Sequence, residues 1–171
     1  MGEEPQDDPG QAIAPGRTRG RGAAELSPLQ RAVGLLSRRE HSRLELTRKL
    51  CERGLAVDEV EAAVEKLATD GWQDDTGFAR FLLRSRVSGG YGPIRIRAEL
   101  TTHGLEREAI GAVLDGFDGD WSQNARELVE RRYGTGVAAS QRLQRKAADF
   151  LLRRGFDGDC IRRATRFDPE A

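Results

Sequence analysis

A short pattern returns three times along this chain, at intervals of about 50 residues, and it constrains the fold more than any other feature. In each copy an apolar residue lies eight positions before a glycine, and a leucine lies four positions before it. The three glycines are Gly54, Gly104 and Gly155. Apolar residues spaced by four follow the period of an α-helix, and a glycine after such a run is typical of a helix end. Three copies of one helical unit are therefore expected.

A second set of aligned positions precedes the first and predicts another helix in every unit. Ala32, Ala79 and Ala125 each begin an apolar stripe, and an arginine follows seven residues later. These arginines are Arg39, Arg86 and Arg132. A third apolar stripe follows each aligned glycine, so each unit is expected to have three helices.

These units predict an all-α protein of three tandem three-helix repeats that form a curved helical solenoid. The expected repeats span residues 26–71, 72–118 and 119–171. One unit alone is not expected to bury its apolar faces, whereas stacked units are. Two helix starts carry capping boxes, Ser27 with Gln30 and Ser42 with Glu45.

The first 25 residues have a different composition from the rest of the chain. They are rich in proline, glycine and charge and contain one bulky apolar residue, Ile13, so a disordered tail is predicted. The longest apolar run, residues 109–114, is far short of the roughly 20 residues that a membrane span needs. The acidic N-terminus does not resemble a signal peptide, and two cysteines make no disulfide framework. A soluble, monomeric, cytoplasmic protein is expected.

The charges are sorted by helix, although 28 basic and 28 acidic side chains cancel in sum. The predicted second helices (42–54, 92–104, 138–155) hold eleven Arg or Lys against four Asp or Glu. The predicted third helices (57–70, 105–118, 156–168) hold five against twelve. If equivalent helices lie side by side, the solenoid has a basic ridge and an acidic one. A basic ridge points to an anionic partner, although charge that merely covers a solvent face explains it too.

Two motifs resemble those of the RecX family of regulatory proteins. The first is Ser42-Arg43-x-Glu45-Leu46-x-x-Lys49-Leu50-x-x-x-Gly54. The second starts at Asp75-x-x-Phe78-Ala79, passes Arg86 and ends in Gly90-Tyr91-Gly92-Pro93-x-Arg95-Ile96-x-x-Glu99-Leu100-x-x-x-Gly104. The resemblance covers about residues 27–167, and the third unit matches in pattern only.

The resemblance implies a modulator of the RecA recombinase without catalytic activity of its own. Such proteins bind the RecA filament on single-stranded DNA, lie along its groove, and usually inhibit ATP hydrolysis and strand exchange. A three-unit curved rod with a basic face suits that task. Bare single-stranded DNA is expected to bind only weakly.

Nine cations are predicted to form the ridge that faces the filament or its DNA: Arg39, Arg43, Lys49, Arg86, Arg95, Arg97, Arg132, Arg145 and Lys146. The segment Gly90-Tyr91-Gly92 is predicted to be a mobile connector. Tyr91 is expected to serve as a hinge or packing residue, with stacking on a base or a partner residue as the alternative. Arg39, Arg86 and Arg132 are expected either to pair with carboxylates or to form one phosphate-binding row. Ser42 and Glu45 need no role beyond capping.

Other functions are less well supported by the sequence. No His/Cys/Asp spacing matches a metal site, no phosphate-binding glycine loop is present, and no cofactor is expected. Direct duplex binding through a helix–Gly–helix element is one alternative, but the would-be recognition helix at 57–70 is acidic. A helical scaffold that binds protein without nucleic acid is the other.

Overall fold

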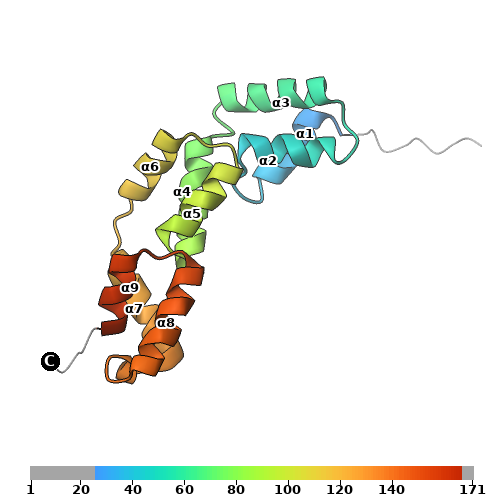
Figure 1. Ribbon diagram of the computed structural model, residues 1–171. Coiled ribbons are helices and arrows are strands. Elements are labelled where there is room, and N and C mark those ends of the chain that lie inside the picture. Colours follow the sequence, from blue (N-terminus) through green and yellow to red (C-terminus); the bar gives the residue numbers. More distant parts are fainter. Residues whose placement is uncertain (1–25, 167–171) are drawn as a thin grey trace, which may run out of the picture.

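The computed structural model describes residues 26–166, which form helices and connecting turns with no strand among them. The predicted disordered tail at residues 1–25 lies outside the described residues. Three helices make each unit: α1 (Pro28–Leu36), α2 (Arg43–Cys51) and α3 (Val57–Thr69); α4 (Asp75–Ser88), α5 (Pro93–Thr102) and α6 (Arg107–Asp115); α7 (Trp121–Tyr133), α8 (Gln141–Arg154) and α9 (Gly158–Arg166). A 3₁₀ turn, η1 (Thr135–Val137), joins α7 to α8. The predicted all-α repeat fold is confirmed (Figure 1).

The repeated sequence positions form the core of each unit. The aligned alanines Ala32, Ala79 and Ala125 are completely buried, where the first helix meets its partners. The leucines before the aligned glycines are completely buried as well. All three glycines have a positive φ, between +79° and +84°, a conformation that favours glycine and ends the second helix.

Each unit closes its own core, which corrects the expectation that stacking buries the apolar faces. Three separate clusters of buried residues lie at 32–67, 78–114 and 125–164. Trp121 packs at the edge of both the second and the third cluster, with its ring centroid 4.3 Å from that of Phe117. The apolar core of each unit is therefore formed by its own three helices, and Trp121 links the cores of the second and third units.

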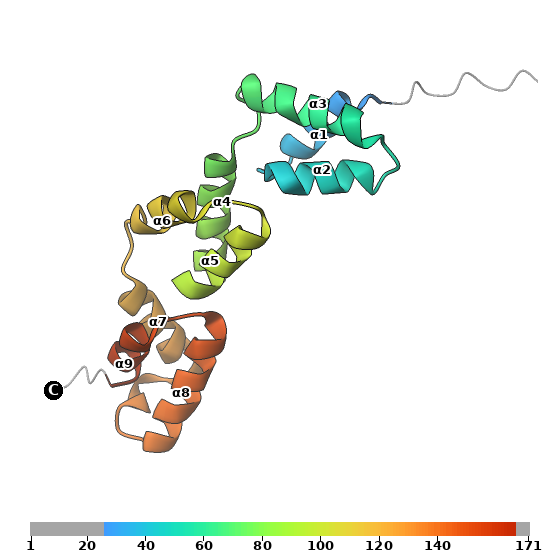
Figure 2. The same ribbon diagram turned by 45° about the horizontal axis from the view of Figure 1, so that its top comes forward.

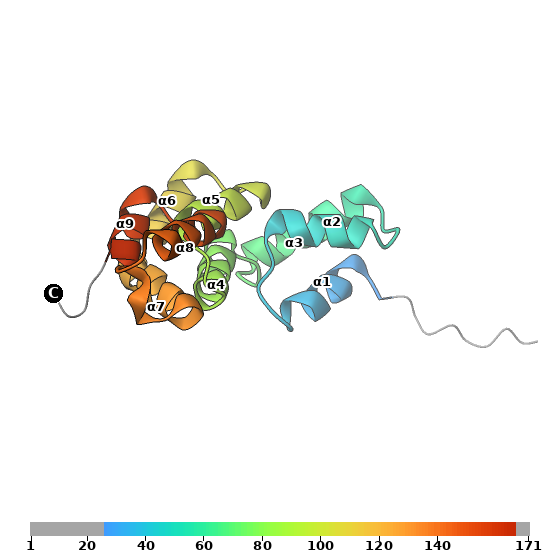
Figure 3. The same ribbon diagram turned by 60° about the horizontal axis from the view of Figure 1, so that its bottom comes forward.

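The units follow one another in a curved row, with equivalent helices on equivalent sides. The second helices α2, α5 and α8 line the inner side of the curve, and the third helices α3, α6 and α9 line the outer side (Figures 1 and 2). The first helices α1, α4 and α7 lie along a third edge (Figure 3). The first unit turns away from the direction that the other two share.

The second helices meet end to end rather than side by side. The backbone N–H groups of Gly92 and Ile94, at the start of α5, donate to the carbonyls of Arg154 and Gly155, at the end of α8, over 2.8 and 3.0 Å. These bonds satisfy orphan groups of both helix ends and align the two helix dipoles. At the next joint, His103 at the end of α5 meets Ser42 at the start of α2, through a 2.9 Å bond between Nδ1 and Oγ.

The absence of a Cβ at Gly92 permits the close joint between α8 and α5. A Cβ built there would stand 2.4 Å from the carbonyl oxygen of Gly155, although the φ of −89° suits any residue. Ser42 occupies the equivalent position in the first unit, twelve residues before the aligned glycine. Its Cβ rules out the same approach, so a side-chain bond replaces the two backbone bonds.

We predict that Gly92→Ala lowers the free energy of unfolding by about 2 kcal/mol, because both backbone bonds across the joint are lost. Gly111→Ala is the matched control, since a Cβ at this helical glycine meets nothing within 4 Å. That variant is expected to gain about 0.5–1 kcal/mol from helix propensity. Urea unfolding followed by far-UV circular dichroism measures both, and equal stability of Gly92→Ala and the wild type would contradict this account of the joint.

Candidate functional site

The nine predicted ridge residues divide into three groups by what their side chains contact. Four form ion pairs: Arg39, Arg43, Lys49 and Arg86. Two lie over aromatic rings: Arg95 and Arg132. Three are exposed and contact no carboxylate within residues 26–166: Arg97, Arg145 and Lys146. The structure therefore does not bring all nine together as one set of available cations.

Arg39 is held by Glu45, the buried centre of a charge cluster in the first unit. Its guanidinium contacts both carboxylate oxygens, over 2.5 and 3.1 Å. Lys49 Nζ lies 2.9 Å from the same carboxylate and 3.3 Å from Nε2 of His41. Ser42 accepts the Glu45 N–H as expected of a helix cap. The expectation that Glu45 only completes a capping box is wrong, because its side chain turns to these cations.

Burial and ion pairing compete at Glu45. Burial alone would raise the pKa of this carboxyl, but hydrogen bonds from Arg39 and Lys49 outweigh it and lower the pKa to about 2. At His41 burial has the opposite effect and lowers the pKa. A hydrogen bond to the Arg39 carbonyl raises it, but the pKa remains below its usual value. Both groups therefore favour the state in which Glu45 is ionised and His41 is neutral.

Arg86 makes the corresponding contact in the second unit, with a different partner. Its Nε and a terminal nitrogen reach the two oxygens of Glu99 over 2.7 and 2.5 Å, a bidentate pair. Hydrogen bonding to Arg86 lowers the pKa of Glu99, and the same bond raises the pKa of Arg86. Of the two roles expected for Arg39 and Arg86, the structure assigns the carboxylate pair to both.

Arg132 has an aromatic contact in place of a carboxylate. Its guanidinium carbon lies 4.8 Å from the centroid of the Phe150 ring and 5.7 Å from that of Tyr133. Phe150 lies five residues before its aligned glycine, the position that Glu99 takes in the second unit. The three aligned arginines are therefore anchored on the second helix of their unit in each case, twice by charge and once by a ring.

Arg43 is turned away from the other predicted residues. Its guanidinium pairs with Glu65 on α3, and its backbone N–H donates to Oδ1 of Asp75 over 2.8 Å. It therefore links α2 to its own unit's third helix and to the start of α4.

The segment Gly90-Tyr91-Gly92, predicted to be a mobile connector, contacts the third unit through backbone bonds and aromatic packing. Tyr91 lies between two cations, with Arg95 5.3 Å and Arg154 4.8 Å from its ring centroid. Arg154 also donates to the carbonyl of Gly89 over 2.8 Å. Tyr91 therefore packs against an arginine from each of the two units and against the edge of the second unit's core.

Arg154 and His103 are joint residues that sequence reasoning missed. Both immediately precede an aligned glycine, and each reaches across to the preceding unit in the chain. Their shared position was visible in the sequence, but their function as links depends on the end-to-end stacking. Burial lowers the pKa of His103, so a neutral ring faces Ser42.

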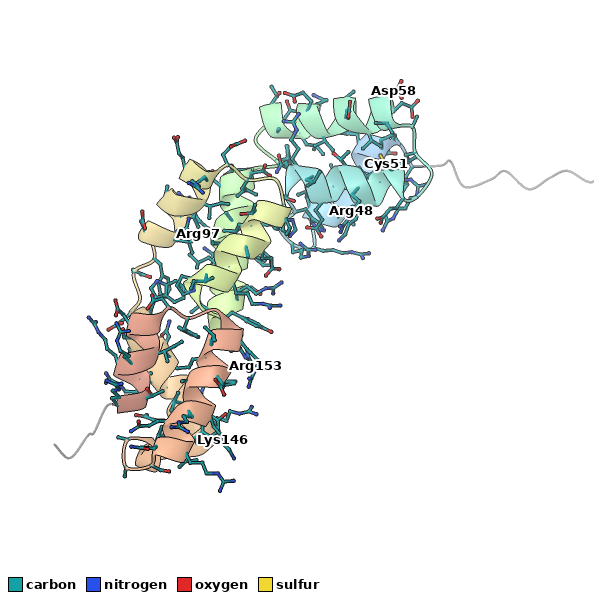
Figure 4. All side chains as sticks on the ribbon, viewed as in Figure 1. Arg48, Cys51, Asp58, Arg97, Lys146 and Arg153 are labelled. Carbon is teal, nitrogen blue, oxygen red and sulfur yellow. The ribbon has the colours of Figure 1, made fainter. Side chains whose placement is uncertain are left out.

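Exposed cations remain along the second helices. Six side chains of α5 and α8 are exposed and contact no carboxylate in the described part of the chain; we call them the inner basic row: Arg95, Arg97, Arg142, Arg145, Lys146 and Arg153. Figure 4 places Lys146 and Arg153 on the inner side of the curve and Asp58 on the outer helix α3. Because α8 abuts α5 end to end, the row continues from one unit into the next.

The contacts of Glu45 make stability depend on pH in a defined direction. The unfolded carboxyl, with an ordinary pKa near 4.5, takes up a proton before the folded one does. The contribution of ionised Glu45 to the free energy of unfolding is therefore complete above about pH 5 and is lost as the pH falls toward 2. We expect wild type to lose about 2 kcal/mol more than Glu45→Gln between pH 5 and pH 2, since both cationic partners are partly exposed to solvent.

Urea unfolding at a series of pH values measures this difference. Glu61→Gln is the control, because Glu61 is exposed and has no ion-pair partner within residues 26–166. It should follow the wild-type pH profile. Parallel profiles for wild type and Glu45→Gln would show that the buried cluster does not stabilise the fold.

Comparison with known proteins agrees with this geometry. The chain matches the family models "RecX, first three-helix domain" over residues 29–67, "RecX, second three-helix domain" over 74–114 and "RecX, third three-helix domain" over 118–165. Within the described residues, no helix combines the length and apolarity that a membrane crossing needs.

Relatives share most of the sequence. The "Regulatory protein RecX" of Stenotrophomonas maltophilia (strain K279a) is 60% identical over 146 residues, which are 85% of this chain and 90% of that protein. The protein of the same name from Xanthomonas axonopodis pv. citri (strain 306) is 56% identical over 156 residues, 91% of this chain and 96% of that one.

Two crystal structures share the fold. One of a regulatory protein RecX has a TM-score of 0.66 at 20% identity and covers 80% of this chain and 69% of its own. That of RecX from Lactobacillus salivarius has a TM-score of 0.65 at 22% identity, with 78% and 89% covered. With three family domains matched in order and relatives alike over nearly their whole length, the chain belongs to the RecX family of regulatory proteins.

Proposed function

We propose that this protein binds the RecA filament on single-stranded DNA in the cytoplasm and inhibits its ATP hydrolysis and strand exchange. It acts as a monomer and a regulator, without a catalytic reaction of its own. The inner basic row faces the groove of the filament and its anionic DNA, while the acidic outer helices face away from the DNA. The resemblance of the two motifs to the RecX family supports the choice of partner, and the exposed cations of α5 and α8 support the choice of binding face.

The observation that carries the proposal is the continuity of the inner basic row across a joint between units. Gly92 and Gly155 bring α5 and α8 into backbone contact, so the exposed cations of the two helices belong to one pair of helices joined end to end. Cations spaced along a line suit a polyanion, because each neutralised phosphate adds to binding. A scattered set of surface charges would not have this property.

The ion-paired arginines have a different part in this mechanism. Arg39 and Arg86 are already bonded to carboxylates, so they hold first and second helices together rather than contact phosphate. We propose that they set the orientation of the inner side, and that Arg97, Arg145 and Lys146 contact the anionic partner directly. Phosphate contact therefore falls to residues of α5 and α8 in this proposal.

The two alternative functions make different demands. A duplex-binding helix–turn–helix would place α3 or α6 in the major groove, where the carboxylates of Asp58, Glu61 or Glu108 meet phosphate repulsion. A scaffold that binds protein alone would need no continuous row of unpaired cations. The salt dependence of binding separates the scaffold from the proposed function, since phosphate contacts weaken steeply with added salt.

We predict that Arg97→Ala, Arg145→Ala and Lys146→Ala combined raise the concentration needed to inhibit RecA ATP hydrolysis by about tenfold, since each removes one exposed charge. The three side chains are exposed and unpaired within the described residues, so helicity and the melting temperature should stay unchanged. The assay is RecA ATP hydrolysis on single-stranded DNA, with the protein titrated from far below to equal stoichiometry.

The matched control removes the same charge from the outer helices, as Arg107→Ala, Arg163→Ala and Arg166→Ala combined. These arginines are likewise exposed and unpaired within residues 26–166. The control should inhibit like wild type. If both triple variants inhibit normally, the inner basic row has no part in the mechanism, and if wild type has no effect at any ratio the proposed function is discarded.

A further inference from the structure

A groove at the joint between the first and second units lies apart from the inner basic row. Its volume is about 730 Å³, and its walls come from α2, α3 and the end of α5. Leu44 and Ala62 supply apolar surface, with Leu44 52% exposed although it is a large apolar residue, and the buried Val64 lies at the base. A molecule that covered Leu44 would remove this apolar surface from water, which favours binding.

The rim of the groove is acidic. Asp58, Glu61 and Glu65 lie at intervals of three and four along α3, so their side chains share one face of that helix. Glu65 is paired with Arg43, whereas Asp58 and Glu61 contact no cation in the described part of the chain. Two carboxylates on this rim are therefore available to a cationic partner.

The groove also crosses the joint itself. His103 and Gly104 of the second unit line it opposite Arg43 and Leu44 of the first. A Cβ placed on Gly104 would stand 3.6 Å from Leu44 Cδ2, so the two units are in contact there. No backbone hydrogen bond between α5 and α2 holds this joint among the described residues, unlike the joint between α8 and α5. A molecule seated in the groove would touch both units at once.

We infer that this groove is a docking site for a protein segment that carries an apolar side chain flanked by lysine or arginine. The apolar side chain packs beside Leu44, and the cations pair with Asp58 and Glu61. Occupancy bridges the joint that side chains alone hold, and therefore stabilises one angle between the first unit and the rest. The inference goes beyond the proposed function and does not depend on it, because the inner basic row attracts the opposite charge.

The test is an NMR titration of the full-length protein with a synthetic probe peptide, acetyl-Gly-Lys-Leu-Lys-Gly-amide. Amide shifts are expected to change at Leu44, Glu61 and Gly104, with affinity falling as salt is added. Asp58→Asn with Glu61→Gln should weaken binding about fivefold, as expected for two exposed ion pairs. Leu44→Ala should weaken it by a similar factor through loss of apolar contact.

The matched control is Glu108→Gln with Asp115→Asn, which removes the same charge from exposed positions on α6. It should bind the probe like wild type, and the peptide acetyl-Gly-Glu-Leu-Glu-Gly-amide should not bind. Equal shifts at the acidic residues of α6 and α9 would mean nonspecific charge attraction and would overturn the inference. Unchanged binding by Asp58→Asn with Glu61→Gln would overturn it too.

One further variant separates an external partner from the chain itself. Arg17, Arg19 and Arg21 precede α1 and carry the charge that the groove attracts. If their replacement by serine strengthens probe binding, the chain's own N-terminal residues occupy the groove, and the external partner is ruled out. Unchanged probe binding supports the external segment. Failure of the RecA assay, with the probe seated in the groove, would count against the proposed function alone.

Discussion

Two backbone hydrogen bonds, from Gly92 and Ile94 to the carbonyls of Arg154 and Gly155, determine how the second and third units are arranged. They join a helix end that lacks acceptors for its N–H groups to one that lacks donors for its carbonyls. The pairing makes two short helices into one nearly continuous element, with their dipoles aligned. The position of every cation on α5 relative to those on α8 follows from this contact. Tyr91, which contacts both Arg95 and Arg154, packs beside this joint.

At the joint between the first and second units, the end of α5 likewise meets the start of α2, but no backbone hydrogen bond links the two helices in the described residues. Ser42 replaces Gly92, and His103 replaces Arg154, so an imidazole–hydroxyl hydrogen bond stands where two backbone bonds would be. With these two residues changed, the first unit is attached to the second through side chains, whereas the second and third units are joined by backbone bonds. The direction change between the first unit and the others lies at this weaker joint (Figure 1). The acidic, partly apolar groove lies there as well, so a partner seated in it would touch both units.

Charge is distributed in this protein at two levels. Within each unit, an arginine near the end of the first helix is anchored on the second helix, by Glu45, by Glu99 or by the Phe150 ring. Among the described residues, exposed unpaired cations gather on α5 and α8 and exposed carboxylates on α3 and α6, whereas the outer helix α9 carries three arginines of its own. These partly buried pairs contribute to the fold because the carboxylates of Glu45 and Glu99 are each held by two hydrogen bonds from an arginine, whereas fully exposed cations contribute little to stability. Those exposed cations are therefore available for binding.

The sequence by itself determined the helices, the three units and most of the core. Leu50, Leu100 and Leu151 could be assigned as buried because a helix places residues four apart on one face, a local rule that needs no tertiary contact. The glycines that end the second helices could be placed as well, because a glycine after an apolar helical run is typical of a helix end. The family was also within reach, since its motifs are contiguous stretches of residues.

Only the tertiary structure decided which cations are available and how the units join. Glu45 lies nine residues before its aligned glycine and Glu99 five before its own, so alignment of the repeats did not reveal that both bond the equivalent arginine. The contact of Gly92 with Gly155 joins residues 63 positions apart, beyond the reach of any local pattern. Helix periodicity fixes which side of a helix is apolar, but the rotation and end contacts of packed helices fix which charges meet. The rotation and end contacts of helices depend on distances in space that a one-dimensional sequence does not contain.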